Sequence, residues 1–143
     1  TVSPGPTIVS TATLKEVASW YSDLTEEDMR RRMRTTIEID GVPAFWEDKL
    51  FSQSDRVVNF KLGNLHFVGV NPCQRCIVPT RNAVTAKVNS DFQKIFVNKR
   101  RDLPEWVNKS RFNHYYKLAV NTRLVSEEVG NKVIKVGDEI VIL

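Results

Sequence analysis

Three segments of the sequence place apolar residues at helical spacing. The first starts at Thr13, which with Glu16 three residues later matches a capping box, and its apolar stripe continues through Leu14, Val17, Ala18 and Tyr21. The second starts at Thr25, whose hydroxyl can cap an acidic first turn, and it ends in arginines that suit the negative end of the helix dipole. The third lies within residues 91–101. There Phe92, Ile95 and Phe96 share one face, and we interpret this stripe as core packing rather than as a cofactor-binding motif.

Most remaining segments alternate apolar and polar residues with the period of two that is typical of strands. Residues 36–40 alternate in this way, and residues 57–62 and 65–70 flank Gly63-Asn64, which suits a tight hairpin turn. The sequence also predicts a long strand over residues 115–125, two short strands within residues 132–143, and a loop or edge strand in residues 1–12. Many short strands with a few short helices predict a mainly β fold. We expect a closed or partly closed barrel, because closure removes exposed strand edges.

The size and composition of the chain add limits to this picture. Its 143 residues suit one hydrophobic core, so we expect a single domain over residues 1–143. With 41% hydrophobic and 27% charged residues, and no apolar run near the roughly 20 residues that span a bilayer, the sequence indicates a soluble protein with no membrane partner. The chain starts with Thr1 rather than Met and shows no signal-peptide pattern, so we expect that it was trimmed or excised from a longer chain.

Basic residues outnumber acidic ones only slightly, with 21 lysines and arginines against 17 aspartates and glutamates and a net charge of +4. They gather in two clusters: Arg30, Arg31, Arg32 and Arg34, and Lys99, Arg100 and Arg101. Solvated helix faces explain such clusters more often than nucleic acid does. The chain lacks zinc-finger spacing, a helix-turn-helix pattern and the aromatic strand motif of nucleic-acid-binding domains, so we expect no nucleic-acid partner.

Residues 73–81 carry most of the candidate chemistry, because two thiols, two guanidinium groups and a hydroxyl fall within this short segment. A thiolate is the form of cysteine that binds metals or attacks sulfur, and a neighbouring cation favours it, so Arg75 and Arg81 point to a reactive cysteine. In an extended segment Cys73 and Cys76 would face opposite sides of the strand. That geometry disfavours a local disulfide and a shared zinc site.

Several roles for the cysteine pair compete. One C-x-x-C motif without a second Cys or Cys/His pair cannot close a tetrahedral zinc site, and His66 and His114 lack ligand spacing, so we expect no zinc. A thioredoxin-like redox pair needs a βαβ context that the predicted strands and Pro79 do not offer. Two buried cysteines acting as small hydrophobic residues are a third interpretation, which the flanking arginines weaken. Two cysteines at this spacing fit a reducing compartment, and we expect a cytoplasmic protein.

One site could use both the thiols and the arginines. Soft thiolate ligands suit a soft, electron-rich metal centre and arginine forks match phosphate, so a cofactor with a metal–sulfur head and a phosphate tail would engage both. With these residues the sequence resembles the MOSC family, the C-terminal domain of molybdenum cofactor sulfurases and relatives such as the amidoxime-reducing components. The resemblance is carried, in order, by Arg32-Met33-Arg34-Thr35-Thr36-Ile37, Pro43-Ala44-Phe45-Trp46-Glu47-Asp48, Cys73-x-Arg75-Cys76 with Pro79-Thr80-Arg81, and Val136-Gly137-Asp138.

The resemblance implies a MOSC-type β-barrel and a site for the molybdenum cofactor, molybdopterin. Cys76, in the position of the second cysteine of the block, would be the reactive residue that ligates molybdenum or carries sulfur as a persulfide. The resemblance further implies cofactor contacts from a set of polar residues: Arg34, Thr36, Arg75, Thr80, Arg81, Glu47 and Asp48. For Glu47 and Asp48, a salt bridge to the arginine run is an alternative of equal weight. The implied partner is a sulfur donor such as a cysteine desulfurase, or an electron-transfer protein.

The sequence departs from the family pattern at Thr36, where the family has Asn, and in the turn after the cysteine block. There residues 82–86 read Asn-Ala-Val-Thr-Ala in place of D-P-x-T-G, which leaves the shape of this turn open. Three functions therefore stand side by side: a cofactor-binding or sulfur-carrier module, a molybdenum-dependent reductase of N-hydroxylated compounds, and a degenerate barrel kept as an interaction domain. Turnover with bound cofactor would identify the reductase. A degenerate domain would show neither metal nor a reactive thiol.

Overall fold

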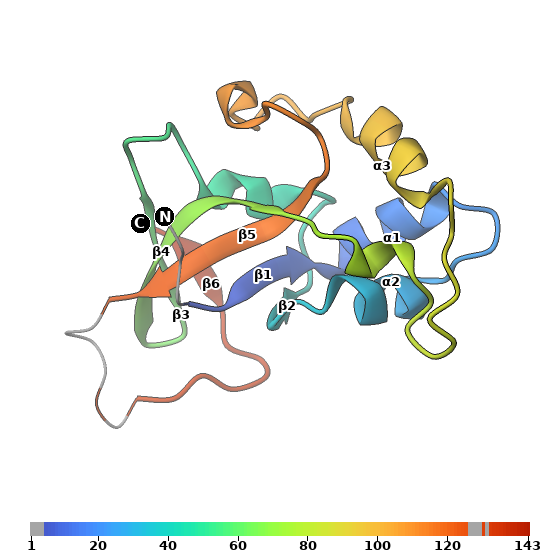
Figure 1. Ribbon diagram of the computed structural model, residues 1–143. Coiled ribbons are helices and arrows are strands. Elements are labelled where there is room, and N and C mark those ends of the chain that lie inside the picture. The colour runs from blue at the N-terminus through green and yellow to red at the C-terminus, as the bar shows by residue number, and fades with distance from the viewer. Residues whose placement is uncertain (1–4, 126–129, 131) are drawn as a thin grey trace.

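The central feature of the structure, a computed structural model that describes residues 5–125, 130 and 132–143, is one six-stranded sheet (Figure 1). Its strands are β1 (Thr7–Ser10), β2 (Ile37–Ile39), β3 (Val58–Leu62), β4 (Leu65–Gln74), β5 (Lys117–Leu124) and β6 (Ile140–Ile142). Their order is β2-β1-β5-β4-β3-β6, in which β1 and β2 pair parallel and the other neighbours pair antiparallel. The prediction of a mainly β fold is confirmed, but the sheet curls into a half-barrel that stays open between β2 and β6.

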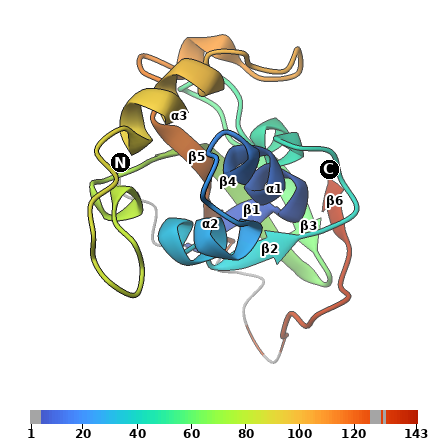
Figure 2. The ribbon, with the colours of Figure 1, turned by 90° about the vertical axis from the view of Figure 1, so that its right-hand side faces the viewer.

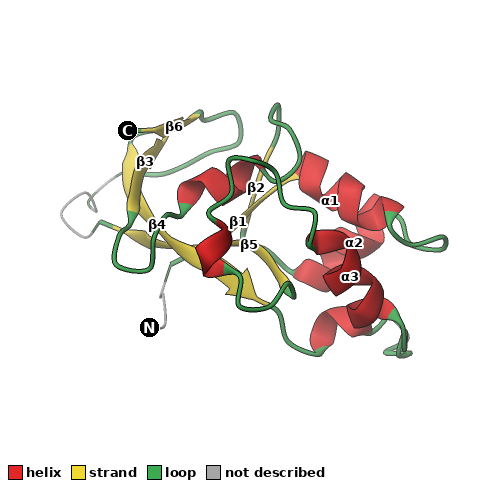
Figure 3. Ribbon diagram, turned by 90° about the horizontal axis from the view of Figure 1, so that it is seen from above, coloured by secondary structure: helices red, strands yellow, loops and turns green. Residues whose placement is uncertain are grey.

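Three short α-helices gather at one end of this sheet (Figure 3). They are α1 (Thr11–Ser19), α2 (Glu26–Met33) and α3 (Phe92–Arg100), and the 3-10 segments are η1 (Trp46–Leu50), η2 (Val78–Thr80) and η3 (Lys109–Arg111). A view onto this end shows α1 and α2 in front of the strands (Figure 2). The three α-helices confirm the helical spacing in the sequence. No helix in the described part of the chain is both long enough and apolar enough to cross a membrane.

The first helix begins earlier than its sequence pattern predicts. Its N-cap is Ser10, whose hydroxyl accepts a hydrogen bond from the Thr13 backbone N–H at 3.0 Å. The prediction of Thr13 as the cap is wrong because β1 runs directly into α1 and brings Ser10 to the cap position. Thr13 is buried within the first turn, where its hydroxyl accepts from the Phe45 backbone N–H at 2.7 Å. The second helix begins as predicted, with Thr25 and Asp28 in a reciprocal capping box.

The first and last segments of the chain differ from their predicted strands. β1 pairs on both sides, with β2 and β5, so it is an inner strand and not a loop or edge strand; residues 1–4 of the predicted segment lie outside the described residues. Between residues 132 and 143, β6 is the one strand, where the sequence predicted two. The turn predicted at Gly137-Asp138 is present: the Asp138 carboxylate accepts from the Lys135 backbone N–H at 2.9 Å, and Gly137 has a φ of 100°. The first of the two predicted strands is absent, because residues 132–135 form no strand.

The predicted hairpin is confirmed as β3 and β4, with Gly63 at a positive φ of 58° in the turn. Two clusters of buried apolar side chains pack against the sheet. One lies under the helices and includes Val9, Leu14, Met33, Phe96 and Leu118, and the other surrounds η1 and includes Ile8, Leu50, Phe60, Phe67 and Val120. Ile8 and Val9 belong to different clusters because successive side chains of a strand point to opposite faces.

Candidate functional site

The two cysteines lie in different environments at the end of β4. The strand shifts register twice near Pro72, which has no N–H for the ladder, and it ends at Gln74. Cys73 is half-buried and packs against the apolar cluster under the helices, whereas Cys76 is exposed, and both thiols are free. The predicted separation of the two thiols is therefore present, although the extended segment stops before Cys76.

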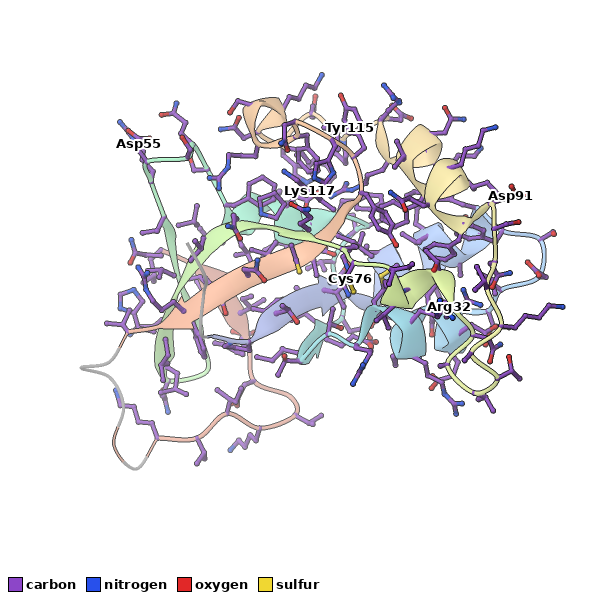
Figure 4. The ribbon with its side chains drawn as sticks, viewed as in Figure 1. Arg32, Asp55, Cys76, Asp91, Tyr115 and Lys117 are labelled. Carbon is purple, nitrogen blue, oxygen red and sulfur yellow. The ribbon has the colours of Figure 1, made fainter. Side chains whose placement is uncertain are left out.

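The turn that carries Cys76 is held from two sides. Tyr116 donates its hydroxyl to the Cys76 carbonyl at 2.9 Å, and the Arg75 backbone N–H donates to the Tyr116 carbonyl at 3.0 Å. Burial raises the pKa of Tyr116 to about 12, so the hydroxyl keeps its proton as a donor. From α2, Arg32 donates to the Pro79 carbonyl at 3.0 Å, and Figure 4 shows Cys76 and Arg32 beside η2. These contacts fix the turn between β5 and α2.

Arg32 is a site residue that the sequence interpretation missed. Only 3% of it is exposed, its second terminal nitrogen donates to the Asn89 side chain at 2.7 Å, and its guanidinium lies 5.3 Å from the centre of the Phe92 ring. A signal for it was present, because Met29, Arg32 and Met33 share the buried face of α2 at helical spacing. Tyr116 was missed as well, and its position within the strand predicted over residues 115–125 gave no comparable signal.

Arg75 turns into the protein rather than toward Cys76. Its guanidinium donates to Cys73 Sγ at 3.3 Å, to the Leu118 carbonyl at 3.5 Å and to the Met33 carbonyl. Its Nε is buried and has no hydrogen-bond partner among the described residues. Arg75 therefore ties β4 to β5 and α2, and the thiol that it contacts is the half-buried one.

A cleft of about 280 Å³ opens between α2 and the loop that follows η2, and we call it the arginine cleft. Its lining residues are Arg31, Arg32, Arg34, Val78, Arg81, Asn82, Ala83 and Ala86. Arg34 and Arg81 are exposed, and the ion pairs found among the described residues involve neither of them. Val78 lines the cleft two residues after Cys76, so the exposed thiol and these free guanidinium groups lie in the same part of the molecule.

The loop that borders the arginine cleft forms a defined turn despite its departure from the family pattern. The Asn82 side-chain oxygen accepts from the backbone N–H groups of Val84 at 2.8 Å and Thr85 at 2.9 Å, as an Asp would. Ala86 adopts a positive φ of 61°, a conformation that favours glycine. Asn82 thus shapes the turn, and Ala86 carries backbone strain. Thr80 lies buried before the turn and donates its hydroxyl to the Ile77 carbonyl at 2.5 Å.

Glu47 and Asp48 lie inside the half-barrel, each only 1% exposed, and neither lines the arginine cleft. Asp48 pairs with Arg100 at 2.6 Å, so its salt-bridge partner comes from the second basic cluster and not from the arginine run. Glu47 accepts from the Ser10 backbone N–H at 3.1 Å, and its other oxygen has no partner among the described residues. Burial raises the pKa of Glu47, and the neighbouring Asp48 carboxylate raises it further. Burial also raises the pKa of Asp48, whereas the Arg100 guanidinium lowers it.

Thr36 lies just before β2 and is not one of the residues that line the arginine cleft. Its hydroxyl accepts from the Thr7 backbone N–H at 3.4 Å, and the residue lines a groove of about 810 Å³ between β2 and the segment that leads into β6. Within the described residues, no three His, Cys, Asp or Glu side chains gather as a set of metal ligands. Of the predicted site residues, Arg34 and Arg81 line the arginine cleft, whose lining residue Val78 follows Cys76 by two positions. Arg75 and Thr80 support the segment around Cys76. The remaining predicted residues, Thr36, Glu47 and Asp48, do not line the cleft.

The comparison with known families agrees with the order of these segments along the chain. A family model described as the MOSC domain matches residues 7–141, which include the arginine cleft, the cysteine segment and the six strands up to residue 141. No curated protein matches the sequence.

Proposed function

This chain belongs to the MOSC domain family, and we propose that it binds the molybdenum cofactor, or carries sulfur for it, through Cys76. The family is associated with molybdenum cofactor binding and sulfurase-related function. The observation that carries the proposal is the exposed, free thiol of Cys76 on a fixed turn beside the arginine cleft.

The residues of the arginine cleft fit the phosphate end of such a cofactor. Arg34 and Arg81 are exposed without a carboxylate partner among the described residues, and a guanidinium group matches phosphate with two parallel hydrogen bonds. The Cys76 thiolate is a soft ligand of the kind that suits molybdenum bound to sulfur. When bound, the cofactor would supply the redox chemistry, while this chain binds and orients it.

The contacts around Cys76 support a positioning role for its neighbours. Tyr116 and Arg32 hold the backbone on either side of the turn, which restricts the positions that the exposed Cys76 side chain can reach. Ligand sites work best when a supporting shell fixes the ligating residue. The same exposure would let a partner protein reach the thiol.

As a sulfur carrier, Cys76 would act as the nucleophile. Its thiolate would attack the terminal sulfur of a persulfide on a cysteine desulfurase, so that an S–S bond forms on Cys76 while the S–S bond of the donor breaks. The donor cysteine leaves as a thiolate. The transfer conserves electrons and needs no further oxidant or reductant. Cys73 is less suited to this role because it is half-buried and contacts Arg75.

The proposal is tested by the molybdenum and pterin content of the protein after purification without oxygen from a host that makes the cofactor. We expect the unmodified protein and the matched control Cys73→Ser to retain cofactor and Cys76→Ser to lose it. Circular dichroism should show the native fold in Cys76→Ser, because the side chain is exposed.

Absence of cofactor from all three proteins would contradict direct ligation. Persulfide transfer is then tested by incubation with a cysteine desulfurase and cysteine, followed by assay of cyanide-releasable sulfur. Sulfur on the unmodified protein but not on Cys76→Ser would support the carrier role, and its absence from both would contradict the proposed function. Turnover of an N-hydroxylated substrate by the loaded protein, with an artificial electron donor, would extend the proposal to a reductase.

A further inference from the structure

Positive charge is concentrated in a part of the molecule that the proposed function does not use. Residues 92–118 contain seven lysines and arginines but only two acids, Asp102 and Glu105, and this surplus of five exceeds the +4 of the whole chain. Together with η1 this segment forms a surface that we call the basic face, made of Lys49, Arg101, Lys109, Arg111 and Lys117. All five are exposed or partly exposed.

No carboxylate neutralises the basic face among the described residues. The ion pairs found there join carboxylates to Arg30, Arg31 and Arg100, and to no residue of the face. Lys117 donates to the Arg111 carbonyl and the Asn113 side chain, both of which are neutral. Burial and the neighbouring Arg111 lower the pKa of Lys117, as expected where like charges crowd together.

Aromatic rings hold two of these cations in place. The Lys49 ammonium lies 5.2 Å from the centre of the Trp106 ring, and the Arg101 guanidinium lies 5.1 Å from the centre of the Tyr115 ring. Cations that are already restrained lose less side-chain freedom when a partner binds. Trp, Tyr and Arg are also the residues that contribute most to protein interfaces.

The basic face is continuous with the cysteine segment. Lys117 pairs across the sheet with Gln74 at the end of β4, and the preceding residue, Tyr116, donates to the Cys76 carbonyl. Figure 4 shows Lys117 between Tyr115 and Cys76. A protein that contacts the basic face would therefore lie beside the exposed thiol.

We propose that the basic face docks the acidic surface of the protein that delivers sulfur or electrons to Cys76. The delivery to Cys76 in this inference rests on the proposed function. Uncompensated positive charge beside a reactive residue steers an acidic partner toward it. A protein fits better than nucleic acid because cations cover the Trp106 and Tyr115 rings, which are then not free to stack on bases. A membrane surface fits less well, because binding there depends on apolar side chains and Trp106 is the large apolar residue that residues 92–118 expose.

The test uses the whole chain and a fluorescein-labelled polyglutamate peptide as the acidic probe. Binding is followed by fluorescence anisotropy at low and at physiological salt. We expect Arg101→Glu/Lys109→Glu to weaken binding by at least about tenfold, because both side chains are exposed and the reversal removes attraction and adds repulsion. The matched control Lys15→Glu/Lys61→Glu makes the same charge change at exposed positions on α1 and β3 and should bind as the unmodified protein does.

The position of the bound peptide on the protein is measured by acetylation of lysines with and without the peptide. We expect the peptide to protect Lys49 and Lys109 from acetylation and to leave Lys15 and Lys61 unprotected. Equal binding by the two reversed proteins, or equal protection of all four lysines, would overturn the proposal. Tighter binding of duplex DNA or of phosphatidylserine vesicles, lost in Arg101→Glu/Lys109→Glu, would assign the face to another class of partner and overturn it too. Cys76→Ser should bind polyglutamate normally, so failure of the cofactor and sulfur assays with intact peptide binding would count against the proposed function alone.

Discussion

Replacement of Arg32 by Met should destabilise the protein and loosen the turn that carries Cys76. Arg32→Met keeps an apolar side chain on the buried face of α2 but removes the donor to the Pro79 carbonyl, and a buried carbonyl without a partner costs about 1–3 kcal/mol. Loss of the contact with the Phe92 ring adds about 0.5–2 kcal/mol. Burial of the new side chain returns about 1 kcal/mol. We therefore expect the free energy of unfolding to fall by about 0.5–4 kcal/mol, with a central value of about 2 kcal/mol.

The matched control is Arg31→Met, which makes the same chemical change on the same helix at a side chain that is 55% exposed. It should change the free energy of unfolding by no more than about 0.5 kcal/mol. Urea unfolding followed by tryptophan fluorescence measures both variants. Hydrogen exchange adds a local measurement, because the backbone N–H groups of Arg81 and Asn89 donate to the Val78 and Thr80 carbonyls within the supported segment. These two amides should exchange faster in Arg32→Met than in the unmodified protein, and their exchange rates should not change in Arg31→Met.

Equal stability of the two variants, with unchanged exchange at Arg81 and Asn89, would refute this account of Arg32. A loss of stability without faster local exchange would show that Arg32 supports the core but not the cysteine turn. Either result would also weaken the argument that the protein fixes Cys76 in place.

Three further predictions concern the turn, the barrel interior and the thiols. Ala86→Gly should raise the free energy of unfolding by about 0.5–1 kcal/mol because it relieves the positive φ, whereas Ala83→Gly in the same turn should lower it in urea unfolding. Because burial raises the pKa of Glu47, the folded protein keeps a proton that the unfolded chain releases. Its stability should therefore fall as the pH rises above the ordinary glutamate pKa of 4.5, and less steeply in Glu47→Gln. Equal slopes would contradict this. Iodoacetamide should modify Cys76 at least about tenfold faster than Cys73, measured by mass spectrometry of the tryptic peptides that separate them, and equal rates would contradict the assigned exposures.

Local sequence signals predicted much of the fold. Thr25 with Asp28, and Gly63 in the hairpin, depend on residues a few positions apart, so the pattern alone contains what is needed. The choice between Ser10 and Thr13 as a helix cap was different. Both are good cap residues, and only the packing of β1 decides which of them stands at the start of the helix. Cys76 was singled out because Arg75 and Arg81 lie close to it in sequence, and its role stays a prediction.

Long-range partners account for the rest. Glu47 and Asp48 are charged residues, which the sequence alone predicts to lie near water. Both are buried, and Asp48 pairs with the guanidinium of Arg100, which is 52 residues away in the sequence. Thr36 follows Arg34 by two residues but lines the groove beside β2 instead of the arginine cleft. The parallel pairing of β2 with β1 places it there, and no local pattern encodes that pairing. Arg75 was predicted to act on Cys76, and its actual contacts with Met33 and Leu118 depend on how α2 and β5 pack.

The opening in the half-barrel affects the tendency of the protein to aggregate at high concentration. The free edges of the sheet belong to β2 and β6, each only three residues long. So short an edge offers an incoming strand only a few backbone hydrogen bonds, and short edges are one means by which sheet proteins avoid aggregation. On β2 the central residue is Glu38, whose carboxylate is paired with Arg30 at 2.6 Å, so a growing sheet would meet charge there as well. The protein can thus leave its barrel open and still resist growth into larger assemblies.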